Sequence, residues 1–91
     1  MEIKPYEIEF LDNVTKNDIP ALPVTIEGRI NRAIRERLTV SPDKLGKALH
    51  HEFKGSFRLR VGDYRIIYEI EIPERKVLIT AIRHRKDVYE R

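Results

Sequence analysis

The sequence between residues 56 and 68 reads Ser56-Phe57-Arg58-Leu59-Arg60-Val61-Gly62-Asp63-Tyr64-Arg65-Ile66-Ile67-Tyr68. In its first half, apolar and basic side chains alternate with a period of two, which is typical of a half-buried strand. Gly62-Asp63 then marks a tight turn, and a nearly continuous apolar and β-branched run follows over residues 64–72. This composition predicts a β-hairpin whose second strand lies in the middle of a sheet.

The flanking segments extend this hairpin into a larger sheet. Pro73-Glu74-Arg75 predicts a second turn, and residues 77–82 predict another strand of similar quality. Because both connections are short, we expect an antiparallel meander. Near the N-terminus, apolar side chains alternate with glutamates, so residues 3–10 are expected to form a first strand.

The segment between these strands has the period of a helix. Apolar residues recur there at helical spacing: Leu22, Ile26, Ile30, Ala33, Ile34 and Leu38. They predict one long amphipathic helix that ends at Ser41-Pro42, because the residue before a proline is pushed out of the helical region. Short helical turns are expected within residues 13–23 and 43–49. The predicted fold is one α+β domain spanning residues 1–91, a small antiparallel sheet with N-terminal helices packed on one face.

Composition narrows the class of protein. The 91 residues suffice for one small domain, and the mixed signs among the 36% charged residues argue against a disordered tail. The absence of cysteine excludes disulfides and a cysteine nucleophile, and it fits a reducing cytoplasm. Neither a signal peptide nor a membrane-spanning apolar run is visible. We expect a cytoplasmic protein with no cofactor and no metal site, since the adjacent His50 and His51 would point opposite ways in a strand.

Basic residues are concentrated in the C-terminal part of the chain. Residues 1–53 carry 8 Lys/Arg and 9 Asp/Glu, whereas residues 54–91 carry 10 and 6. This surplus indicates either a polyanionic partner or a sheet edge kept soluble by charge. The same choice is open for the outward arginines of the long helix at positions 29, 32 and 35, which either touch RNA or form a solvated face.

Alternation places arginines on the sheet face away from the helix. If the apolar side chains of residues 57–61 face the helix, Arg58 and Arg60 point the other way. Arg65 opens the next strand and Arg83 closes the last one, so a meander brings these positions together. The chain then continues with further basic and aromatic residues: His84, Arg85, Lys86 and Tyr89. Such a surface suits RNA, because guanidinium groups bind phosphate through paired hydrogen bonds and an aromatic ring stacks on a splayed base.

Two segments resemble the RelE/ParE toxin superfamily. The first comprises Lys47-Ala48-Leu49 and residues 53–68, and its most diagnostic part is Gly62-Asp63-Tyr64-Arg65-Ile66-Ile67-Tyr68. The second covers residues 77–89 and ends on His84-Arg85-Lys86-Asp87-Val88-Tyr89. The order and spacing of the motifs fit, and the resemblance is most specific over residues 45–91.

The resemblance implies a fold and an activity. RelE-type members have a compact antiparallel sheet with N-terminal helices on one face, and they are the toxic halves of type II toxin–antitoxin pairs. They enter the ribosomal A site and cut the exposed mRNA codon, using the 2′-OH of the mRNA as nucleophile and no metal. The implied partners are the ribosome, mRNA and a cognate antitoxin that forms a heteromeric complex with the toxin.

The resemblance also assigns candidate catalytic residues. Arg65 resembles the strand arginine that stabilises the transition state, Arg83 the basic residue that assists the leaving group, and Tyr89 the C-terminal tyrosine that stacks on or orients the nucleotide. Arg58 and Arg60 stand where a well-studied member has two lysines. The candidate RNA-binding set is Arg58, Arg60, Lys54, Arg85 and Lys86.

The arginines at positions 58 and 60 leave the general base open. An arginine does not lose its proton in practice, whereas the lysines of the well-studied member can. The candidates for the base are then Tyr89, His84 or a ribosomal group. The pKa of a histidine lies near neutrality, which makes His84 attractive, but a sheet-edge histidine with no chemical task is the alternative.

Two other functions compete with mRNA cleavage. The ParE branch of the same superfamily poisons DNA gyrase and shares much of the Gly-Asp-Tyr-Arg pattern, although its members often lack the full C-terminal basic and tyrosine set found here. A catalytically silent relative that only binds an antitoxin is the second alternative, which the replacements at positions 58 and 60 keep open.

Overall fold

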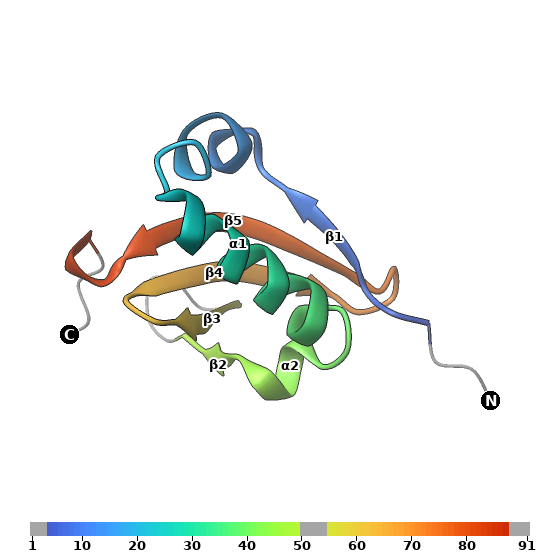
Figure 1. Ribbon diagram of the computed structural model, residues 1–91. Helices are drawn as coiled ribbons and strands as arrows, with labels where there is room; N and C mark the ends of the chain where they lie inside the picture. The colour runs from blue at the N-terminus through green and yellow to red at the C-terminus, as the bar shows by residue number, and fades with distance from the viewer. Residues whose placement is uncertain (1–3, 50–54, 88–91) are drawn as a thin grey trace.

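The computed structural model describes residues 4–49 and 55–87. Five strands form one sheet in the order β1-β5-β4-β3-β2. Helix α1 (Val24–Ala33) lies across one face of this sheet (Figure 1). The predicted α+β class, with helices from the N-terminal half packed on one sheet face, is confirmed.

The predicted hairpin forms the middle of the sheet. Strand β3 (Ser56–Val61) pairs antiparallel with β4 (Tyr64–Glu71), and Val61 lies opposite Tyr64 across a two-residue turn. Gly62 opens that turn with a φ of 58°, in the left-handed region that favours glycine. Strand β5 (Lys76–His84) pairs antiparallel with β4, and it is longer than the predicted strand 77–82.

The two outer strands differ from a simple meander. Strand β1 (Glu7–Phe10) pairs parallel with β5, which corrects the expectation that all neighbouring strands run antiparallel. The chain passes through the helices and the hairpin between β1 and β5, and such a long connection permits parallel pairing. The two-residue strand β2 (Lys47–Ala48) pairs antiparallel with β3 at the other edge, where a helical turn was expected.

The long helix predicted from residue 22 to residue 38 forms as two joined pieces. Helix α1 continues directly into the π-helical segment η2 (Ile34–Leu38), with Ala33 in right-handed helical geometry at the junction. A short π-helix, η1 (Val14–Asp18), precedes α1, and a four-residue helix, α2 (Pro42–Leu45), follows η2. Along the described ranges, none of these helices has the length and apolar character that a membrane span requires.

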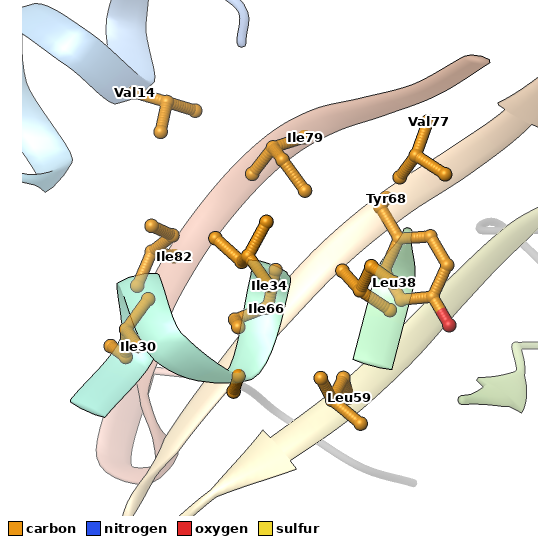
Figure 2. Close-up of a cluster of buried hydrophobic side chains, with 11 residues drawn as sticks. Val14, Ile30, Ile34, Leu38, Leu59, Ile66, Tyr68, Val77, Ile79 and Ile82 are labelled. Atoms are coloured by element: carbon orange, nitrogen blue, oxygen red, sulfur yellow. The ribbon is translucent and has the colours of Figure 1, made fainter. Parts of the chain in front are cut away.

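The core lies between the helices and the sheet face that they cover. Figure 2 shows apolar side chains of α1 and η2 packed over side chains of β3, β4 and β5. Its largest fully buried side chain is Tyr68, whose hydroxyl donates a hydrogen bond of 2.6 Å to the carbonyl oxygen of Pro42. The same hydroxyl fills the space beside Gly46, where an added Cβ would collide with it. This contact anchors α2 to the sheet.

Candidate functional site

Three arginines form a row across three adjacent strands. The register places Arg60 of β3 directly opposite Arg65 of β4, and Arg65 directly opposite Arg83 of β5. Directly opposed residues share one sheet face, with Cα atoms about 4.5–5.5 Å apart. The neighbouring row of Leu59, Ile66 and Ile82 is buried under the helices, so the arginine row lies on the opposite face. The prediction that these three arginines come together on that face is therefore confirmed for their backbone positions.

The first half of the row follows from the hairpin. A two-residue turn between Val61 and Tyr64 fixes which residues oppose each other, so Arg60 and Arg65 are paired by local sequence alone. Arg58 lies two residues before Arg60 on the same face, opposite Ile67. We call Arg58, Arg60, Arg65 and Arg83 the arginine face.

The second half of the row depends on an irregularity in β5. The register shifts between Ile67 and Tyr68, so that Ile67 lies opposite Ala81 while Tyr68 lies opposite Ile79. Thr80 is the extra residue, and its hydroxyl donates a 3.2 Å hydrogen bond to the carbonyl oxygen of Ile67. This bulge puts both Ile79 and Ile82 in the core and leaves Arg83 on the arginine face.

The members of the arginine face differ in exposure. Arg65 is buried, with 8% of its surface accessible, whereas Arg60 is exposed and Arg58 is partly buried. The side chain of Arg83 is 41% exposed. A buried guanidinium keeps its charge, because arginine does not lose its proton at any physiological pH. The face therefore presents a fixed cation flanked by more accessible ones.

Arg83 is held at the edge of the sheet by Asp18. Its Nη1 lies 2.7 Å from Oδ2 of Asp18, the last residue of η1. The same Oδ2 accepts a 3.0 Å hydrogen bond from the backbone N–H of Ile82. Strand β1 ends at Phe10, and beyond that point η1 lies beside β5. Asp18 thus satisfies a backbone donor on the edge of β5 that β1 no longer covers.

His84 faces the other way from the arginines. Alternation puts it on the helix side of β5, where its ring meets the ring of Tyr64 edge-on at a centroid distance of 5.1 Å. Its Nδ1 accepts a 3.2 Å hydrogen bond from the backbone N–H of Lys86. Backbone register thus places His84 on the sheet face opposite the arginine face.

The remaining predicted residues lie around the end of β5 or outside the described ranges. Arg85 is the first residue of the 3₁₀ turn η4 (Arg85–Asp87), and its Nε lies 3.8 Å from Oδ1 of Asp63 in the β3–β4 turn. Its backbone N–H donates to the carbonyl oxygen of Asp63 at 2.7 Å, and Lys86 is exposed beside it. The predicted residues Lys54 and Tyr89 lie outside the described residues.

A hollow of about 360 Å³ opens where η1 and the start of the helical layer meet the end of the sheet. Apolar and polar side chains share its lining: Asn17, Asp18, Ala21, Leu22, Tyr64, Ile82, Arg83 and His84. Arg83 therefore belongs to the arginine face by register, while its side chain also lines this hollow.

The chemistry that this arrangement supports is anion binding. Guanidinium groups offer paired donors whose geometry matches phosphate oxygens. Within residues 4–49 and 55–87, no group of three His, Asp or Glu side chains is placed to hold a metal ion. The guanidinium groups of the arginine face offer donors that suit a phosphate and added negative charge on it.

Sequence reasoning missed Asp18 and the bulge at Thr80. No local pattern shows that η1, which ends at Asp18, will lie against a strand 64 residues later. The sequence contains a weak indication of the bulge. The spacing of the apolar residues changes from two, between Val77 and Ile79, to three, between Ile79 and Ile82.

Comparisons of the sequence with known proteins find toxins. Residues 11–89 match the sequence family described as the ParE toxin of the type II toxin–antitoxin system. The chain is 32% identical to Toxin RelG of Mycobacterium tuberculosis over 87 residues, which cover 96% of this chain and 99% of the relative. It is 29% identical to Toxin RelE of the same organism, over 93% of this chain and 87% of the relative.

Solved structures show the same similarity. A chain in the crystal structure of the toxin–antitoxin complex RelBE2 from Mycobacterium tuberculosis is 30% identical and superposes with a TM-score of 0.82, covering 88% of this chain and 98% of that one. The archaeal RelE–RelB complex from Pyrococcus horikoshii gives a TM-score of 0.73 at 24% identity, covering 92% and 99%. At that identity the second match shows the shared fold alone.

Proposed function

The chain belongs to the RelE/ParE superfamily of toxins from type II toxin–antitoxin systems, and from that premise we propose that it is a ribosome-dependent endoribonuclease. It cuts mRNA in the ribosomal A site without a metal ion, in the cytoplasm where ribosomes translate. One observation carries this proposal: the row of Arg60, Arg65 and Arg83 across three strands.

A row of like charges has an energetic cost. Like charges directly opposite each other in a sheet are destabilising by a few tenths of a kcal/mol to about 1 kcal/mol per pair. Two such pairs occur here in succession, and the middle arginine is buried. The carboxylate of Asp18 offsets part of the charge at Arg83, and a bound phosphate would offset the charge of the row further. The arrangement therefore suits a polyanionic ligand.

The proposed reaction needs little beyond charge and position. The 2′-oxygen attacks the adjacent phosphorus and loses its proton to a base, while the bond from phosphorus to the 5′-oxygen breaks and that oxygen gains a proton. The products are a 2′,3′-cyclic phosphate and a free 5′-hydroxyl. Arg65 stabilises the added charge on the phosphorus oxygens, and Arg83 supports the leaving oxygen. Arg58 and Arg60 hold the neighbouring phosphates.

The base in this scheme is Tyr89, His84 or a group of the ribosome. Arginine cannot fill the role. His84 lies on the sheet face opposite the arginine face by register and would act from the hollow that it lines together with Arg83. Tyr89 is also the residue proposed to stack on the nucleotide. Lys54, Arg85 and Lys86 are proposed to bind RNA around this centre.

A cognate antitoxin is the proposed partner in the resting cell. The similar chain from Mycobacterium tuberculosis was crystallised in a toxin–antitoxin complex. An antitoxin segment that carries acidic side chains would neutralise the arginine face and exclude RNA from it. The expected assembly is a heteromeric complex.

Gyrase poisoning remains a second candidate, because the matching family is described as the ParE toxin. The two activities leave different damage. Purified protein added to translating ribosomes should produce mRNA cut within an A-site codon. Intact mRNA together with gyrase-dependent DNA breaks would instead assign the chain to the ParE activity.

A further inference from the structure

Asp18 makes two contacts that differ in kind. Its Oδ2 accepts from the backbone N–H of Ile82 at 3.0 Å and pairs with Nη1 of Arg83 at 2.7 Å. The first contact fixes η1 to the sheet, which is a structural task. The second fixes the guanidinium of an arginine that belongs to the arginine face.

The two partners are unequally exposed. The side chain of Asp18 is 9% exposed, whereas that of Arg83 is 41% exposed. An enclosed carboxylate is retained only where donors satisfy it, and Ile82 and Arg83 supply two. The Arg83 side chain, in contrast, also lines the hollow at the end of the sheet. The pair therefore consists of a fixed acceptor and a cation that can still reach a ligand.

The donors of Arg83 divide into two groups. Nη1 contacts Asp18 and also donates a 3.2 Å hydrogen bond to the carbonyl oxygen of Ile82. These two acceptors account for both protons of Nη1. Across the part of the chain that the structure describes, no hydrogen bond is assigned to Nε or Nη2 of Arg83. Nε and Nη2 form the edge of a guanidinium that binds a phosphate with two parallel hydrogen bonds.

We propose that Asp18 is a positioning residue for Arg83, which holds Nη1 at the sheet edge and so presents the Nε–Nη2 edge to the substrate phosphate. This inference rests on the proposed function, because it gives Arg83 a substrate. The tether lowers the conformational freedom that a long side chain would otherwise lose on binding RNA. Asp18 acts through Arg83 and does not itself touch the mRNA.

Asn13 offers a matched control at the other end of η1, where it precedes the first residue of the helix. Its Nδ2 donates a 3.3 Å hydrogen bond to the carbonyl oxygen of Thr80, so it also ties the region of η1 to β5 without touching Arg83. Asn13→Ala therefore loosens the same interface by one hydrogen bond. A purely structural role of Asp18 predicts similar effects for the two positions.

The test is a double-mutant cycle on single-turnover mRNA cleavage by the purified toxin on programmed ribosomes. Asp18→Ala should lower the cleavage rate roughly 10- to 100-fold, in line with the effect of misplacing a catalytic group. Asn13→Ala should leave the rate unchanged. In an Arg83→Ala background, Asp18→Ala should cause no further loss, because the residue through which it acts is gone. Equal losses in both backgrounds, or an increased rate for Asp18→Ala, would overturn the proposal.

A second variant and a second measurement separate this inference from the proposed function. Asp18→Asn keeps an acceptor for the N–H of Ile82 but removes the negative charge, so it should fold and still cleave more slowly than the wild type. The guanidinium NMR signals of Arg83 should show restricted rotation in the wild type and in Asn13→Ala. Rotation should be faster in Asp18→Asn and free in Asp18→Ala. If the wild type leaves mRNA intact, the proposed function fails while the NMR result still reports on the tether. Unchanged rotation in both Asp18 variants would refute the positioning role directly.

Discussion

Arg65 lies directly opposite Arg83 in the antiparallel pairing of β4 and β5. One of these guanidiniums is buried and the other is held at the sheet edge by Asp18. Two positive charges at adjacent positions on neighbouring strands repel each other, and the carboxylate of Asp18 offsets part of that repulsion at Arg83. A phosphate that binds both guanidiniums would add a second counter-charge.

Replacement of Arg65 by alanine should lower A-site mRNA cleavage by about 100-fold or more, the usual effect of removing one group that stabilises transition-state charge. Arg37→Ala is the matched control, because this arginine is exposed on η2 and carries the same charge. Single-turnover cleavage on ribosomes measures both. Thermal unfolding followed by circular dichroism checks that each variant folds. Full growth inhibition by an Arg65→Ala, Arg83→Ala double mutant would remove both residues from the site.

Tyr89 is expected to act by stacking on the nucleotide. Tyr89→Ala should then lower cleavage roughly 5- to 150-fold, which is the range for losing one base–aromatic stack. Tyr89→Phe retains the ring and should keep most of the activity. Cleavage rates of the two variants on the same programmed ribosomes decide the point. Equal losses for Phe and Ala would instead give the hydroxyl the chemical role, as the general base.

The hydrogen bond from Tyr68 to Pro42 should contribute measurably to stability. Tyr68→Phe leaves the carbonyl oxygen of Pro42 without its buried donor, which costs about 1–2 kcal/mol. Urea unfolding followed by circular dichroism measures the change. Tyr6→Phe serves as the control, since Tyr6 is only partly buried beside Arg75 and its hydroxyl makes no such core contact in the described structure.

The burial of Tyr68 also predicts that the protein loses stability at alkaline pH. Burial, with a smaller contribution from Asp43, raises the pKa of Tyr68 well above its ordinary value of about 10. The unfolded chain ionises this group first, so the free energy of unfolding should fall as the pH rises above about 10. Tyr68→Phe should show a smaller fall over that range. If the free energy of unfolding fell equally with pH in the wild type and in Tyr68→Phe, the phenol of Tyr68 would not be the group responsible.

Gly46 should tolerate no side chain while Tyr68 keeps its hydroxyl. Gly46→Ala places a methyl group on the phenol oxygen and should destabilise the fold by roughly 1–3 kcal/mol, the usual cost of overpacking. Combining it with Tyr68→Phe removes the oxygen and should recover part of that loss. Thermal melts of the two single variants and the double variant test this coupling. If the stability losses of the two single variants simply added in the double variant, the coupling would be disproved.

Local sequence was enough to predict the hairpin and half of the site. A two-residue turn after Val61 sets the register of β3 and β4, so alternation alone places Arg60 opposite Arg65. The helical spacing of the apolar residues likewise predicted the layer formed by α1 and η2. These features depend on contacts between residues close in the chain.

The rest depended on contacts between distant segments. The parallel pairing of β1 with β5 brings η1 against the edge of β5, and only then does Asp18 meet Arg83. The bulge at Thr80 decides which face Arg83 occupies, although strict alternation from Val77 and Ile79 would have put it in the core. His84 was grouped with the arginines because it follows Arg83, yet consecutive residues of a strand point to opposite faces.

Primer extension on mRNA recovered from ribosomes treated with the purified toxin tests the nuclease assignment most directly. We predict new 5′ ends within the A-site codon with the wild type, far fewer of them with Arg65→Ala, and an unchanged number with Arg37→Ala. Full-length mRNA with the wild type, under conditions where the protein still arrests growth, would contradict the assignment.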